Sequence, residues 1–175
     1  MFSKQYTSIK ITLYGLLLLV CYLLQSVPSF GLRVMGNAPE LLFLLCICVA
    51  FNESETFSAF FGLTAGLLND IITDSIVGKS AIIFMFLGFF IPVLLRTLLR
   101  NFFLTYIFMS LGCTLVFLLI EYFFNLMFFT SIPFGTALMK IILPKFFFTE
   151  LLSYPLYFTV KFICRKFWSG GDLLL

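Results

Sequence analysis

The sequence predicts an all-α integral membrane protein that folds as a compact bundle of six transmembrane helices. Hydrophobic residues make up 62% of its 175 residues, and charged residues make up only 11%. An average soluble domain carries about 25% charged residues. The apolar residues also gather in runs that short polar turns separate. A soluble fold of this length would expose too much apolar surface to water, so lipid is the solvent that suits this composition.

Six apolar segments follow one another, and we expect each to be one helical span of a single transmembrane domain that covers residues 1–175. The second and third segments are shorter than the roughly 20 residues that cross a bilayer as a helix, so five spans are the alternative. In the second segment, Asn37 is a candidate N-cap and Pro39 fits the first turn. The segments lie at about residues 11–27, 38–51, 58–73, 80–95, 102–124 and 135–164.

The distribution of lysine and arginine predicts the side of the membrane that each loop faces, because cytoplasmic loops are enriched in these residues. With the N-terminus inside, seven cations lie on the cytoplasmic side and four on the outer side. An even number of spans then places both termini in the cytoplasm. The inner cations are Lys4, Lys10, Arg96, Arg100, Lys161, Arg165 and Lys166, and the outer ones are Arg33, Lys79, Lys140 and Lys145.

The third segment separates its small and polar residues from its bulky apolar ones when it is drawn as a helix. Ser58, Gly62, Gly66, Asn69 and Asp70 fall on one face. Glycines four residues apart let another helix approach closely, which is one way in which membrane helices associate. We therefore expect this face to pack against another helix of the same chain or against a partner. A cradle for a small ligand is the third possibility.

The outer end of this face carries a carboxylate, Asp70, which has three possible roles. It is a solvated group at the helix end, a cap for the next helix, or the partner of a lysine on the same side. Gly78 ends a turn that is rich in loop-forming residues, so the next helix is expected to begin at about Ser80. The candidate lysines are Lys79, Lys140 and Lys145.

A second carboxylate, Glu150, lies in the middle of the last segment. A charge at the bilayer centre costs roughly 2.5–3.5 kcal/mol, so Glu150 must face the protein or a cavity, or carry a proton. It is either a packing residue that hydrogen-bonds within the bundle or a contact for a ligand or partner. Glu40 and Glu121 lie near the outer ends of helices, where we expect them at the membrane interface.

The residue types present give no pattern of a catalytic or metal centre. Histidine is absent, which removes the imidazole base and the commonest metal ligand. The five cysteines lie inside apolar runs, and the carboxylates lack the spacing of metal ligands. The net charge of +3 gives no sign of a nucleic-acid partner. We therefore expect no enzyme activity and no cofactor.

Residues 58–90, SAFFGLTAGLLNDIITDSIVGKSAIIFMFLGFF, resemble the rod shape-determining protein MreD family. That family carries the pattern G-x-x-x-G-L-x-x-D, a short turn, G-x-x-A, and then an apolar helix with a glycine. The second segment, NAPELLFLLCICVAF, is similar to the family's second helix, which opens with a proline. Lys79 departs from the family, whose members often have an apolar residue there. The matching residues are Gly62, Gly66, Leu67, Asp70, Gly78, Ala81 and Gly88.

The resemblance implies a multi-pass scaffold in the bacterial inner membrane that carries out no reaction of its own. Family members bind MreC, a protein with one span and a large outer domain. They work with the actin-like MreB and with the RodA and penicillin-binding-protein synthases of the lateral wall. The chain would then link the cytoskeleton to peptidoglycan synthesis in the elongasome, the machinery that sets cell shape.

The chain is also similar in size and span number to the substrate-binding subunits of energy-coupling-factor vitamin transporters. This is the alternative function, and it predicts an outward-facing cavity into which polar groups converge from several helices. Those subunits usually carry an alanine pattern on the first helix, whereas residues 11–27 hold bulky leucines and one glycine. That difference favours the scaffold. An intramembrane enzyme is a third class, for which the sequence contains no motif.

Overall fold

The computed structural model describes residues 2–26, 39–73, 77–98, 102–127, 135 and 138–166. Every regular element within these residues is a helix. This confirms the all-α class. Within these described residues, three helices contain stretches long and apolar enough to cross a membrane, namely Ile9–Ser26, Lys79–Arg96 and Leu104–Phe124. The described elements are α1 (Phe2–Ser26), α2 (Leu41–Asn52), α3 (Glu55–Ile72), α4 (Lys79–Leu98), α5 (Phe102–Glu121), the π-helical Tyr122–Met127 and Leu138–Ile142, and α7 (Leu143–Lys166).

Helix α2 begins later than the sequence pattern indicates. Glu40 is its N-cap, and the carbonyl of Glu40 accepts the first helical hydrogen bond, from the backbone N–H of Leu44 at 3.1 Å. Pro39 therefore precedes the helix, and its expected place in the first turn was wrong. Asn37, the candidate cap, lies outside the described residues, as do Arg33, Arg100 and the side chains of Lys4, Lys140 and Lys166.

Two other boundaries differ from those expected. Helix α3 begins at Glu55, three residues early, because Ser54 has the extended backbone of an N-cap residue. The last predicted span is divided into a π-helical turn and α7. Pro144 lies in the first turn of α7, directly after the π-helical turn, and Pro155 lies inside the helix.

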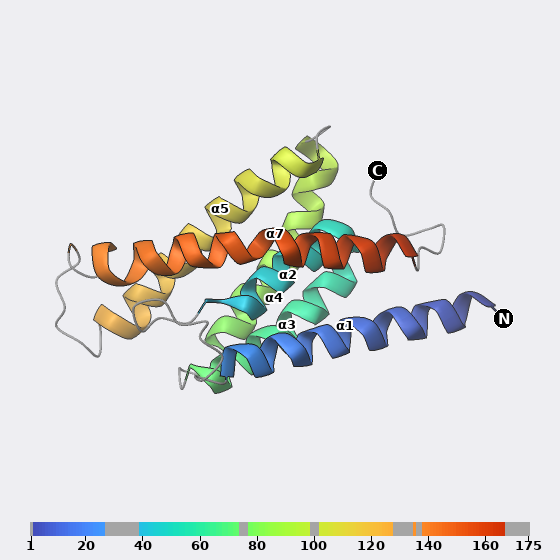
Figure 1. The fold of residues 1–175 in the computed structure, drawn as a ribbon, viewed down its shortest axis with the longest axis horizontal. Helices are drawn as coiled ribbons and strands as arrows, with labels where there is room; N and C mark the ends of the chain where they lie inside the picture. Colours follow the sequence, from blue (N-terminus) through green and yellow to red (C-terminus); the bar gives the residue numbers. More distant parts are fainter. Residues whose placement is uncertain are drawn as a thin grey trace.

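Successive helices run in alternate directions, so that α1 begins and α7 ends at the same end of the bundle (Figure 1). We name the two ends after the residues that flank α2. At the Glu40 end, the side chain of Gln25 in α1 contacts Glu40 and Asn69 of α3. At the Glu53 end, Lys10 of α1 contacts Glu53. Helices far apart in the sequence therefore share polar contacts at both ends.

Helix α2 forms the centre of the bundle, and α1, α3, α4, α5 and α7 all pack against it. Every side chain from Leu41 to Ala50 is buried. Phe43 of α2 stacks on Phe117 of α5 with ring centroids 4.4 Å apart, and it also contacts Phe84 of α4. A helix that is apolar all round suits a position surrounded by other helices or by lipid, and the burial of α2 shows that other helices surround it.

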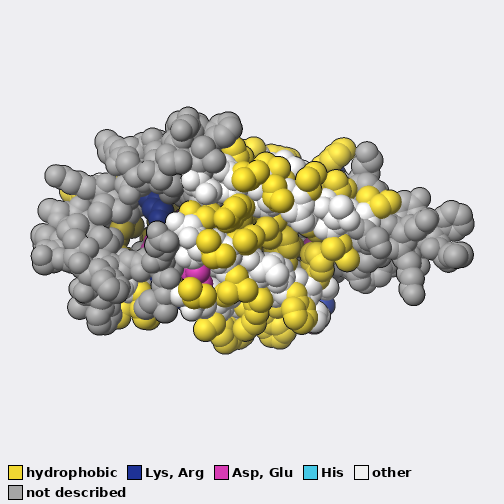
Figure 2. Space-filling model, turned by 90° about the horizontal axis from the view of Figure 1, so that it is seen from below, with side chains coloured by type: hydrophobic (Ala, Val, Ile, Leu, Met, Phe, Trp, Pro, Cys, Tyr) yellow, Lys and Arg dark blue, Asp and Glu magenta, His cyan; other side chains and the backbone are white. Residues whose placement is uncertain are grey.

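The outer surface of the bundle is also apolar. Figure 2 shows hydrophobic side chains spread over the described part of one face. On α7, four large side chains at helical spacing are more than half exposed, namely Phe147, Leu151, Phe158 and Phe162. Such an arrangement is unfavourable in water and suits a bilayer.

Candidate functional site: the polar and glycine contacts between helices

The small-residue face of α3 packs against α4 of the same chain. A side chain at Gly62 would overlap the carbonyl oxygen of Phe84, and one at Gly66 would overlap the backbone of Ala81. From the opposite side, a side chain at Gly88 of α4 would overlap the carbonyl of Ser58, whose side chain is fully buried. Among the possibilities that the sequence left open, these contacts correspond to packing within the chain.

Asp70 caps the N-terminus of α4. Its carboxylate accepts hydrogen bonds from the backbone N–H of Gly78 at 2.8 Å and from that of Ser80 at 3.0 Å. The side chain is only 1% exposed, so Asp70 is not a solvated carboxylate. A negative group at this position also complements the dipole of α4. Gly78 has a φ of +98°, a backbone conformation that favours glycine and that brings its N–H to Asp70.

At the Glu40 end, a side-chain network that centres on Gln25 connects three helices. The Gln25 side-chain amide donates to Asn69 Oδ1 at 2.9 Å and to Glu40 at 3.3 Å, and its oxygen accepts from the backbone N–H of Leu42 at 3.1 Å. Asn69 in turn donates to the hydroxyl of Ser80 at 3.3 Å. Asn69 therefore lies between α1 and the start of α4. The sequence patterns did not single out Gln25.

A buried ion pair joins the same end of α2 to α7. Lys145 Nζ lies 2.6 Å from Glu40 and 2.9 Å from Glu121. The other helices enclose Glu40, and its residue is 2% exposed. Its expected depth at the membrane interface stays a prediction. No local pattern in the sequence relates Lys145 to Glu40.

A second buried ion pair lies at the Glu53 end. Glu53 accepts from Lys10 at 2.7 Å and from the hydroxyl of Tyr14 at 2.6 Å, and both partners belong to α1. The Cys164 thiol of α7 donates to the carbonyl of Asn52 at 3.3 Å. The end of α2 and the turn that follows it therefore contact both the first and the last helix. None of these contacts was predicted.

Glu150 faces α5 from the middle of α7. Its two carboxylate oxygens accept hydrogen bonds from the hydroxyls of Ser110, at 2.7 Å, and Thr114, at 2.6 Å. The residue is 8% exposed, whereas both hydroxyl-bearing residues are fully buried. One turn further along α7, the carbonyl of Ser153 accepts from the Tyr106 hydroxyl at 3.3 Å. The seam between α5 and α7 is therefore polar.

These groups connect helices and offer no constellation for a reaction. Within the part of the chain that the structure describes, no group of three or more cysteines and carboxylates is placed to hold a metal ion. The described polar networks pair carboxylates with lysines, hydroxyls and backbone N–H groups of neighbouring helices. They have the chemistry of interhelical contacts in a membrane protein.

The fold and these contacts define a helical membrane protein whose buried polar side chains join its helices. The sequence profile of the family described as rod shape-determining protein MreD matches residues 6–167. The chain therefore belongs to the MreD family, and the resemblance drawn from residues 58–90 is confirmed. Membership implies a role in rod shape determination, in a family of structural proteins that is not a known enzyme family.

Neither the comparison with curated proteins nor the comparison with solved structures returns a match. The expected similarity to energy-coupling-factor subunits therefore has no support from a solved fold.

Proposed function

We propose that this chain is a non-catalytic scaffold of the lateral-wall elongation machinery that binds MreC. Through MreC it would link the MreB cytoskeleton to peptidoglycan synthesis by RodA and penicillin-binding proteins. Family membership over residues 6–167 supports the role in shape. The binding of MreC is a more specific proposal than the role in shape, and it rests on what the family resemblance implies.

One observation favours a scaffold over a transporter subunit: the polar residues at the Glu40 end bond to one another. A substrate-binding subunit would present convergent polar groups to its ligand. Here Gln25, Glu40, Asn69, Ser80 and Lys145 converge at one end but bond to one another. A ligand would have to break these bonds to bind there. The same contacts join α1, α2, α3, α4 and α7 to one another, which suits a scaffold.

The proposed topology has six spans in one domain of the bacterial inner membrane, with both termini in the cytoplasm. The alternate helix directions and the positions of the cations support it. Lys10, Arg96 and Lys161 lie toward the Glu53 end, and Lys79 and Lys145 lie toward the Glu40 end. Positive charge favours the cytoplasmic side, so we assign the Glu53 end to the cytoplasm. Reporter fusions at the two chain ends test this assignment, and an external signal from either would contradict it.

Affinity purification of the full chain from native membranes after brief cross-linking tests the partner. We expect MreC in the recovered complex, together with a wall synthase. A second multi-pass protein with the same tag is the control for nonspecific recovery. Recovery of the ATPase of a vitamin transporter without MreC would overturn the proposal and favour the alternative function.

A further inference from the structure

One side of α7 faces away from the bundle. Helix α7 runs across one surface of the molecule and packs with its inner side against α1, α2 and α5 (Figure 1). Its outer side carries exposed residues at helical spacing, which fall within one stripe along the helix. We call this the α7 stripe, and it consists of Phe147, Leu151, Tyr154, Pro155, Phe158 and Phe162.

Two hydrogen-bonding groups lie on the α7 stripe. Tyr154 stands at the middle of the 24-residue helix and is 38% exposed. Its hydroxyl has no hydrogen-bond partner within the described part of the chain. Pro155 has no N–H, so the carbonyl of Leu151 lacks the bond that residue 155 donates in a regular helix. A hydroxyl donor and a carbonyl acceptor therefore lie three residues apart on an exposed surface.

Pro92 of α4 offers a comparison within the same bundle. It likewise leaves the carbonyl of Gly88 without a helical N–H. Both residues are buried, and Gly88 packs on the backbone of Ser58 in α3. Prolines are tolerated in transmembrane helices where neighbouring helices, hydroxyl side chains or water satisfy the carbonyls that they free. At Pro92, another helix of the same chain is in place.

At Pro155, the described chain supplies no such neighbour on the exposed side. The hydroxyl of Thr159, one turn further along α7, donates to the carbonyl of Pro155 itself at 2.8 Å. In the proposed six-span arrangement, the middle of α7 lies in the hydrocarbon core, which offers no water. A group from outside the chain is therefore needed to satisfy Leu151 and Tyr154.

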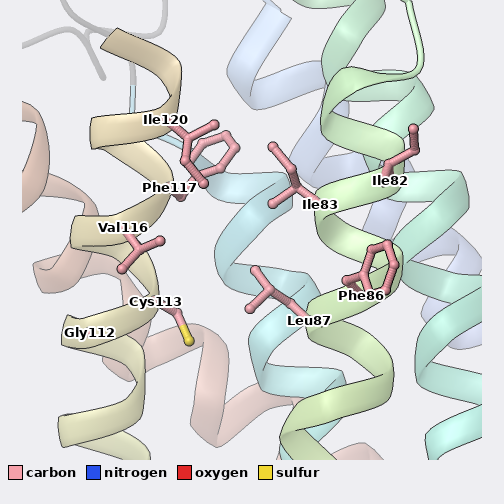
Figure 3. Close-up of a pocket in the computed structure, with 9 residues that line it drawn as sticks. All are labelled: Ile82, Ile83, Phe86, Leu87, Gly112, Cys113, Val116, Phe117 and Ile120. Atoms are coloured by element: carbon pink, nitrogen blue, oxygen red, sulfur yellow. The ribbon is translucent and has the colours of Figure 1, made fainter. Parts of the chain in front are cut away.

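The groove between α4 and α5 places no such demand on its surroundings (Figure 3). Residues such as Ile83, Leu87 and Val116 line it with hydrocarbon, and Cys113 adds a thiol. Lipid suits such walls, and their chemistry does not select a particular occupant. The α7 stripe is different, because whatever covers it must accept one hydrogen bond and donate another at the same depth.

A second copy of this chain meets that condition with its own residues. Two copies in one membrane are related by a two-fold axis along the membrane normal, so their α7 helices run parallel and equal residues face each other. Helical side chains lean toward the N-terminus, whereas helical carbonyls point toward the C-terminus. Tyr154 of one copy is thereby directed toward the level of the Leu151 carbonyl of the other, and symmetry repeats the bond.

We propose that two copies of the chain associate through the α7 stripe, with Tyr154 of each copy donating a hydrogen bond to the Leu151 carbonyl of the other. Phe147 and Phe158 pack on either side of these bonds, where aromatic side chains add contact area. A foreign helix would need a donor and an acceptor of its own at the same depth. The association rests on the proposed six-span arrangement and is separate from the binding of MreC.

Removal of one hydroxyl tests the hydrogen bonds. Tyr154→Phe keeps the ring and deletes the donor in both copies, so the dissociation constant of the dimer should rise roughly tenfold or more. Fluorescence energy transfer between labelled copies of the full chain in liposomes measures this constant. Tyr22→Phe, on α1 and outside the stripe, is the matched control and should leave the constant unchanged. A monomeric natural chain, or equal constants for all three proteins, would overturn the proposal.

Photochemical cross-linking in native membranes identifies what covers the stripe. The photoreactive residue p-benzoylphenylalanine takes the place of Leu151, or of Phe108 on α5 as a control of similar exposure. We expect a cross-linked dimer of the chain from position 151 and none from position 108. A product that contains MreC, or only lipid, from position 151 would overturn the proposal. Recovery of MreC by affinity purification is a separate readout, so the dimer and the proposed function can fail independently.

Discussion

Glu40 and Glu53 lie at opposite ends of the central helix, and each is paired with a lysine from another helix. Lys145 lies 2.6 Å from Glu40, and Lys10 lies 2.7 Å from Glu53. Because α2 has 12 residues, it is about 18 Å long, whereas the hydrocarbon core of a bilayer is about 30 Å thick. In the proposed six-span arrangement, α2 is therefore shorter than the hydrocarbon core that it crosses. The two ion pairs fix the position of α2 along α1 and α7.

Removing the lysine of the Glu40 pair should strongly destabilise the protein. Lys145→Met leaves two carboxylates close together without their cation, and breaking a buried pair costs about 3–5 kcal/mol. The midpoint of thermal unfolding in detergent should fall sharply. The double variant Lys145→Met with Glu40→Gln should recover much of the loss, because the buried charge at position 40 is removed together with its partner.

Arg96→Met is the matched control for this prediction. The Arg96 side chain is 47% exposed where it pairs with Glu55 at 3.0 Å, and exposed pairs contribute only about 0–1 kcal/mol. Its unfolding midpoint should stay close to that of the natural chain. If Arg96→Met and Lys145→Met lowered the midpoint equally, the buried pair would have no special role.

The glycine contacts between α3 and α4 should not tolerate a side chain. In Gly66→Leu the new atoms would meet the backbone of Ala81, which cannot move aside as a side chain can. Overpacking typically costs about 1–3 kcal/mol, and a clash with backbone belongs at the upper end of that range. We expect a lower membrane yield and a lower unfolding midpoint. Gly15→Leu is the control, and equal yields of the two variants would refute close packing at Gly66.

The capping role of Asp70 predicts a local effect at the start of α4. Asp70→Ala removes the acceptor of two backbone N–H groups and should cost about 1–2 kcal/mol. Hydrogen exchange at Gly78 and Ser80 should accelerate in that variant. Asp70→Asn keeps one acceptor oxygen, so its exchange rates at these amides should lie between those of the natural chain and those of Asp70→Ala. Unchanged exchange at both amides in Asp70→Ala would exclude the cap.

The helical face of α3 was predictable from the sequence because it depends only on residues within one helix. The spacing of Ser58, Gly62 and Gly66 determines which side chains share a side, whatever the neighbouring helix is. The spacing does not identify the neighbour, and the sequence left a partner protein as an alternative. In the structure this face packs against α4, whose backbone a side chain at either glycine would overlap.

The buried ion pairs were not predictable, because each joins helices that are distant in the sequence. Glu53 and Lys10 are separated by 43 residues, and no local pattern relates them. The sequence likewise contains no sign that other helices enclose Glu40, because its position near a helix end does not identify its neighbours. The enclosing helices α1 and α7 become visible only when the bundle is assembled.

Glu150 allows a test of whether the polar seam between α5 and α7 stabilises the bundle. Glu150→Leu removes the acceptor of the Ser110 and Thr114 hydroxyls, and interhelical hydrogen bonds in membranes contribute about 0.6–2 kcal/mol each. We expect a lower unfolding midpoint for Glu150→Leu and a smaller change for Glu150→Gln, which keeps an acceptor oxygen. Adding Ser110→Ala and Thr114→Val to Glu150→Leu should recover part of the loss, because the hydroxyls are no longer buried without their partner. The triple variant could instead be less stable than Glu150→Leu by the sum of the losses measured for Ser110→Ala and Thr114→Val alone. That result would show that the three side chains act independently.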